Sequence, residues 1–166
     1  MATTTTLLRG ILGALEAALG PDRPGGALAD VFARYDGEPA DAIDEHVAQL
    51  RGETGASVLV GFLSDDVDER DEAGRPLSAL LRPSVLVVRR RGTRLEEGPD
   101  GVKGATRDAE LLDALYDAAA SALDGHGLSF LRGRALAGEV RDWMGRALVV
   151  EGSRTFPPRA GSGAVA

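Results

Sequence analysis

Two segments of opposite charge hold most of the side chains whose type and spacing could do chemistry. The first is acidic, and clustered carboxylates are able to bind a divalent cation. Its residues are Asp65, Asp66, Asp68, Glu69, Asp71 and Glu72. The run lacks the fixed ligand spacing and the distal bidentate glutamate of a calcium loop. We therefore expect a solvated, mobile loop over residues 64–75 and no metal site.

The second segment is basic. Arg89, Arg90 and Arg91 end the clearest predicted strand, residues 84–91, where alternation places Arg90 on the face opposite the other two. Two interpretations stay open: a solvated strand end, or a charged contact with a partner chain, such as the acidic segment of another copy. Complementary charges of this kind would fix the register of two chains more than they would add affinity.

Trp143 is the single tryptophan and stands at a predicted hairpin turn. A large aromatic side chain at the end of an element either covers the core or anchors an interface. The core interpretation is slightly favoured, and Trp143 stays with the three arginines among the candidate interface residues.

Nothing else in the chain indicates a catalytic site. Cysteine is absent, and the two histidines, His46 and His126, have no triad or ligand partner in the sequence. Residues 98–106 only faintly resemble a phosphate loop, because no Gly-Lys-Ser/Thr follows the glycines. We therefore expect a protein that is not an enzyme and that binds no cofactor or metal.

Composition narrows the class of protein further. The chain has 166 residues, of which 43% are hydrophobic and 27% charged, which suits one folded domain. A formal net charge of −7 argues against a main surface that grips duplex DNA. No signal peptide or apolar run of membrane-spanning length is present, so we expect an intracellular protein with no membrane partner. The domain is expected over residues 1–156, with a flexible tail over 157–166.

Hydrophobic spacing predicts the elements that position these residues. A helical period predicts an amphipathic helix over residues 7–19, capped by Thr6 and ended by Gly20-Pro21, and a stronger one over 107–123. A shorter helix is expected over 39–51. The predicted strands cover residues 31–35, 57–63, 84–91, 128–131, 136–143 and 146–156.

The order of these elements favours an α+β fold. Strands that follow one another without a helix between them favour an antiparallel or mixed sheet of about five to six strands. The N-terminal helix and the second long helix are expected to pack on one face of it. Pro83 predicts a bend or an edge position, and Met144-Gly145 is the expected turn of the last hairpin.

The same layout resembles a known family. Its features are the segment 7–19, a strand ending in Tyr35-Asp36-Gly37, the buried strand Val58 to Leu63, the strand through Val85 to Val88, the helix through Leu111 to Leu115, and a last hairpin through Gly138-Glu139-Val140 and Ala147 to Val150. Over residues 7–156 it resembles the Mu-like bacteriophage tail proteins, described only as a domain of unknown function. More broadly, it is similar to the tail terminator, or tail completion, proteins of long-tailed phages.

The resemblance implies a structural virion protein at the junction of tail and neck, assembled in the host cytoplasm. Copies of the chain would form a hexameric ring that caps the tail tube, stops its polymerisation and meets the head-side connector or stopper. The implied partners are the chain itself, the tail tube protein, the connector and, in a contractile tail, the sheath. DNA would only pass through the lumen of the ring. The acidic segment could line this lumen, or it could contact the next subunit.

Two other interpretations stay open beside the terminator. One is a head-closure or neck adaptor protein of the same tail apparatus. The other is a non-viral accessory domain that binds a small molecule or a protein. The neighbouring genes would separate the viral from the non-viral interpretation.

Overall fold

The computed structural model describes residues 3–35, 54–91, 97–137 and 143–156. In these segments, one five-stranded mixed sheet carries two helices on one face, which is the expected α+β class. The elements are α1 (Thr4–Leu19), β1 (Val31–Tyr35), β2 (Ala56–Arg70), β3 (Pro76–Arg90), α3 (Gly104–Gly125), β4 (Ser129–Ala137) and β5 (Trp143–Thr155). The predicted helix over 39–51 and the predicted tail over 157–166 lie outside the described residues.

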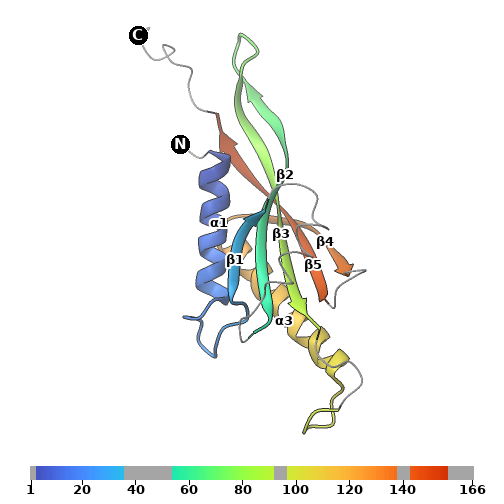
Figure 1. The fold of residues 1–166 in the computed structure, drawn as a ribbon. Helices are drawn as coiled ribbons and strands as arrows, with labels where there is room; N and C mark the ends of the chain where they lie inside the picture. The colour runs from blue at the N-terminus through green and yellow to red at the C-terminus, as the bar shows by residue number, and fades with distance from the viewer. Residues whose placement is uncertain (1–2, 36–53, 92–96, 138–142, 157–166) are drawn as a thin grey trace.

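The strands follow the order β1-β2-β3-β5-β4 across the sheet. β1 runs parallel to β2, while every other neighbouring pair is antiparallel. β1 and β4 therefore form the two edges, and the long strands β2, β3 and β5 lie between them (Figure 1).

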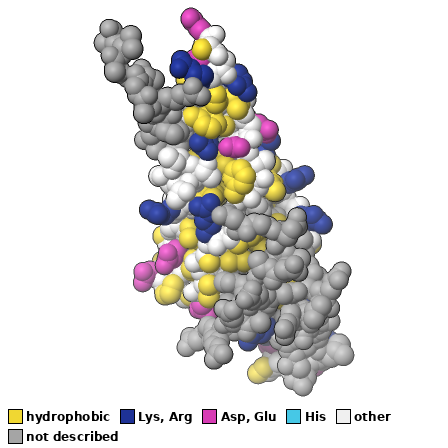
Figure 2. Space-filling view, turned by 45° about the horizontal axis from the view of Figure 1, so that its top comes forward, with side chains coloured by type: hydrophobic (Ala, Val, Ile, Leu, Met, Phe, Trp, Pro, Cys, Tyr) yellow, Lys and Arg dark blue, Asp and Glu magenta, His cyan; other side chains and the backbone are white. Residues whose placement is uncertain are grey.

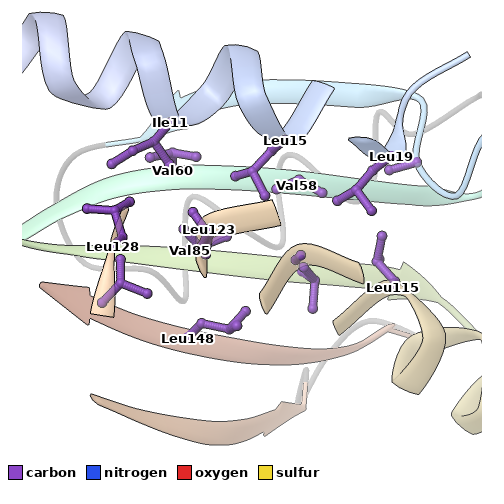
Figure 3. Packing of buried hydrophobic residues seen from close by; sticks show 14 of the residues in the cluster. Ile11, Leu15, Leu19, Val58, Val60, Val85, Leu115, Leu123, Leu128 and Leu148 are labelled. Atoms are coloured by element: carbon purple, nitrogen blue, oxygen red, sulfur yellow. The ribbon is translucent and has the colours of Figure 1, made fainter. Parts of the chain in front are cut away.

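The main core lies between the sheet and its two helices. α1 buries Leu8, Ile11, Leu15 and Leu19, which recur at helical spacing and are at most 2% exposed. Burying each such side chain stabilises the fold by about 2 kcal/mol. Figure 3 shows Ile11, Leu15 and Leu19 of α1 pointing toward the sheet, where Val58 and Val60 of β2 lie on the same face. α3 contributes Leu115 and Leu123 to the same core.

The helix ends differ in detail from the sequence-based prediction. The N-cap of α1 is Thr3 instead of Thr6, because the Thr3 hydroxyl accepts a hydrogen bond from the Thr6 N–H. Gly20 ends α1 with a negative φ, so a left-handed backbone is not the reason for a glycine here. The reason is close packing, because a Cβ at Gly20 would lie 2.4 Å from the Glu16 carbonyl oxygen. α3 begins at Gly104, ahead of the predicted residue 107.

The expectation of a mobile loop over residues 64–75 was wrong. β2 continues through the acidic residues, paired with β3 from Ala56↔Arg89 out to Arg70↔Pro76. A turn between Asp71 and Arg75 closes the hairpin. The Asp71 N–H donates to the Arg75 carbonyl oxygen, and the Arg75 N–H donates to the Asp71 carboxylate. The acidic sequence does not have the apolar pattern that predicts a strand. The outer parts of β2 and β3 are largely exposed to solvent, so charged side chains there destabilise the strands little.

Pro83 lies in β3, a central strand, so the predicted edge position was wrong. The sheet accommodates the missing N–H with local irregularity. β2 has a bulge between Phe62 and Ser64, opposite Pro83. The pairing of β3 with β5 is interrupted between Leu81 and Ser84 as well.

The last hairpin exists, but its predicted turn was misplaced. Met144 and Gly145 lie inside β5, where they pair with both β3 and β4. The predicted strand over 128–131, from Ser129 onward, and the first two residues of the one over 136–143 lie in one strand, β4, while residues 138–142 lie outside the described residues. A glycine within a strand was mistaken for a turn signal.

Candidate functional site

The hairpin of β2 and β3 extends past the end of β1, which pairs with β2 only from Ser57 to Gly61. We call residues 62–79 the arm. It projects at the top of Figure 1, beyond the N-terminal end of α1. All six acidic candidate residues lie on it, four in β2 and two in its turn. Figure 2 shows hydrophobic, basic and acidic side chains next to one another on this projecting end.

Asp71 organises the turn of the arm. Its carboxylate accepts hydrogen bonds from the N–H groups of Ala73 and Arg75 at 2.9 Å and an ion pair from the Arg75 Nε at 2.6 Å. These contacts, above all the hydrogen bond from the backbone N–H of Arg75, hold the pKa of Asp71 below its usual value. Asp71 therefore holds the shape of the turn.

Two further acids bind the arm to the body of the protein. Asp66 forms an ion pair with Arg82, whose Nε also donates to Glu151 at 2.9 Å. The hydrogen bond to Glu151, with both carboxylates nearby, holds the pKa of Arg82 above its usual value. Asp65 lies 3.5 Å from Arg154.

The other three acidic candidates are Asp68, Glu69 and Glu72, and all are exposed. No ion pair joins them to another residue within the described segments. Nor does any cluster of His, Asp or Glu in those segments have the arrangement of a metal site. These carboxylates are the ones that the arm presents to its surroundings.

The three basic candidates lie in different environments. Arg89 points to the helical side, where its Nε lies 3.3 Å from Asp108 and its Nη1 donates to the Thr54 carbonyl at 2.7 Å. Asp108 is 5% exposed, so Arg89 balances a buried charge and belongs to the framework. Arg90 is exposed and makes a contact of its own, and Arg91 is half-buried. The structure does not gather the three into one basic surface.

Trp143 is 4% exposed and belongs to a second, smaller apolar cluster. This cluster lies on the second face of the sheet, opposite α1 and α3, and also contains Leu59, Leu86 and Val88. Trp143 therefore packs as a lid over core residues, and the described structure leaves it little surface to offer as an interface anchor.

Strand β4 is a surface that the sequence-based prediction missed. It forms one edge of the sheet, and its residues 129–135 are all exposed. Phe130 and Leu131 are 51% and 46% exposed, and Arg132 and Arg134 follow them. The pattern was visible as a strand, but only the strand order shows that it is an edge.

The described surface includes hollows of about 300 Å³ each at two places that bear on the candidate residues. One is lined by Arg89, Thr54 and apolar residues, and its arginine is already occupied by Asp108. The other adjoins β4 and is lined by Tyr116, Arg146 and the backbone region of Gly133. Arg146 lies over the Tyr116 ring and pairs with Asp113 at 2.9 Å.

The turn that resembles a phosphate loop is fixed by its own side chains. Asp100 accepts a hydrogen bond from the Val102 N–H and forms an ion pair with Arg107. The ion pair with Arg107, together with the Val102 N–H, holds the pKa of Asp100 below its usual value. The Val102 N–H and the Arg107 guanidinium are therefore already bound by Asp100.

Comparison with known proteins leaves the family open. No protein-family model and no curated protein matches the sequence. No helix in the described segments is both long and apolar enough to span a membrane.

Proposed function

We propose that the protein is a structural assembly protein of the tail-terminator type, which forms a ring with copies of itself and has no catalytic role. The observation that carries the proposal is the arm. It is a hairpin that extends past the end of β1 and, beyond Leu77, past the end of β5, and it presents exposed carboxylates and exposed apolar side chains together. Such a projection offers little to small-molecule chemistry and much to contact with another chain.

A closed ring needs two different surfaces on each copy, because its contacts run head to tail. The arm lies on the β1 side of the sheet, and the exposed strand β4 forms the opposite edge. The arm is acidic, whereas β4 carries arginines and no acid. The fold thus has two unlike surfaces at a distance from each other.

In the proposed assembly the ring caps the tail tube, stops its growth and joins the tail to the head-side connector. The partners are the chain itself, the tube protein, the connector and, in a contractile tail, the sheath. A net charge of −7 suits a conduit for DNA, because like charge keeps the polyanion from adhering. The site of action is the tail–neck junction of a virion.

The test is assembly on a tail tube. The purified chain is mixed with short tubes of the tail tube protein from the same genome and examined by electron microscopy and sedimentation. We expect rings at one end of each tube and an arrest of tube growth. A chain that neither forms rings nor binds tubes would contradict the proposal, and rings that bind the connector but no tube would favour the neck adaptor.

A further inference from the structure

Within the described residues, the sheet has an open edge on each side. β4 has β5 as its one neighbour among the described strands, so no described strand lies beside the outer backbone groups of β4. On the other side, β1 ends at Tyr35, opposite Gly61, and the arm continues β2 without a further neighbour in the described segments. Open edges are templates for pairing with another strand.

The charged side chains of the two edges lie on the same face of the sheet. Asp66 and Glu69 on the arm pair with residues of β3 that belong to the second face. Arg132 and Arg134 on β4 pair with residues of β5 that belong to that face as well. If the arm of one copy paired with β4 of another and the sheet continued across the contact, the carboxylates of the arm and the guanidinium groups of β4 would lie on the same face of the sheet.

The apolar side chains match in the same way on the helical face. Phe62 pairs with Pro83, and Val67 pairs with Ala79, both in register with the buried helical-face residues of β3. On β4, Phe130 pairs with Val150 of the main core. Phe62, Val67 and Phe130 are 41%, 42% and 51% exposed, so each could pack against a second chain.

We propose that the arm of one copy pairs with strand β4 of the next copy, so that the sheet continues from subunit to subunit. This inference rests on the proposed function, since it names the contact that would build the ring. The occupant of the β4 edge is a second copy of this chain because both its charge and its apolar residues complement the arm. The contact is head to tail, which generates a closed ring when the rotation closes.

The net charges of the two surfaces set the direction of the contact. The arm holds the six acidic candidates against Arg70 and Arg75, whereas β4 holds Arg132 and Arg134 and no acid. Contact between two arms would place like charges together, as would contact between two β4 edges. Arm-to-edge pairing is the combination that charge favours, and the hollow beside Tyr116 and Gly133 leaves room for an apolar side chain there.

The test is a charge-exchange experiment on the full chain. Glu69→Arg and Arg134→Glu each reverse one charge at an exposed position without an ion pair in the described segments, so both variants should fold. Each is expected to weaken self-association by about tenfold or more. The double variant, with both charges exchanged, is expected to recover it. Arg9→Glu, on the exposed side of α1, makes the same change in net charge as Arg134→Glu and is the matched control for that variant.

Sedimentation velocity measures the association, and circular dichroism checks the fold of each variant. Recovery in the double variant would support arm-to-edge pairing, because arm-to-arm or edge-to-edge contacts gain nothing from the exchange. A wild-type ring that both single variants leave unchanged would overturn this inference and leave the proposed function standing. A wild-type chain that stays monomeric both alone and with tail tubes would overturn both.

Discussion

Arg89 and Trp143 show at the scale of the residue how position decides the role of a side chain. Both residue types are common in interfaces, yet here Arg89 neutralises Asp108 and Trp143 closes an apolar cluster. The exposed residues that remain for contact are ones with no distinctive motif, such as Glu69 and Arg134. Sequence alone could not separate the two groups, because burial depends on elements far along the chain.

The Arg89–Asp108 pair predicts a clear loss of stability on truncation. Arg89→Ala leaves the Asp108 carboxylate, 5% exposed, without its guanidinium, and also leaves the Thr54 carbonyl without that donor. We expect a loss of about 3 kcal/mol in the free energy of unfolding, the low end for a broken buried pair, because Asp108 keeps another contact. Urea unfolding measures it, and the exposed Arg9→Ala should change stability by less than about 0.5 kcal/mol. An equally small change for Arg89→Ala would contradict the assigned role.

The turn of the arm predicts a lowered carboxyl pKa that survives loss of its ion pair. The backbone N–H of Arg75 is the main cause of the lowered pKa of Asp71, and Arg75→Ala keeps that N–H. We expect an NMR titration to find the pKa of Asp71 below its usual 3.8 in the wild type and still lowered in the variant. A full return to the usual value in Arg75→Ala would show that the side-chain pair dominates.

The same lowered pKa fixes the pH range of the turn. A carboxyl whose pKa is lower in the folded state stabilises the fold at pH values above its unfolded pKa. That contribution is lost as the pH falls through the folded pKa. The turn should therefore keep its shape at neutral pH and loosen as the pH falls through the lowered pKa of Asp71.

At the scale of the element, the spacing of apolar residues predicted those helices and strands whose pattern is complete within their own sequence. The helix over 7–19 was predicted closely because one apolar face repeats along it, and the bounds of the strand over 31–35 were predicted correctly. The outer half of β2 was missed, because its strand character comes from pairing with β3 instead of from its own acidic sequence. Pairing between strands is a tertiary fact, and a single stretch of sequence does not carry it.

Gly61 predicts a site where β1 and β2 tolerate no side chain. A Cβ at Gly61 would lie 2.7 Å from the Tyr35 carbonyl oxygen and 2.9 Å from its ring, so β1 would have to shift. We expect Gly61→Ala to destabilise the protein by about 1–3 kcal/mol, as measured by urea unfolding. The matched control is Gly13→Ala in the exposed face of α1, where nothing lies within 4 Å, and it should stabilise by about 1 kcal/mol. A Gly61→Ala variant as stable as the wild type would show that the two strands are not so closely packed.

At the scale of the whole molecule, the sheet is a strip with unlike edges. Its acidic arm and its arginine-bearing strand β4 lie on opposite sides of the strand order. The sequence-based hypothesis of oppositely charged surfaces set the acidic segment against Arg89, Arg90 and Arg91. We propose Arg132 and Arg134 as the basic side of the contact instead, because the strand order places β4 at an edge of the described sheet. The ring itself stays a proposal that follows from these edges.

The most direct test of the central claim is the native mass of the wild-type chain over a range of concentrations, measured by light scattering with and without tail tubes. The account predicts one closed oligomer, about 104 kDa for a hexamer of 17.3 kDa chains, whose mass stops rising once the ring is complete. A mass that stays at 17.3 kDa under every condition would contradict the account. A mass that grows without limit would show pairing that does not close.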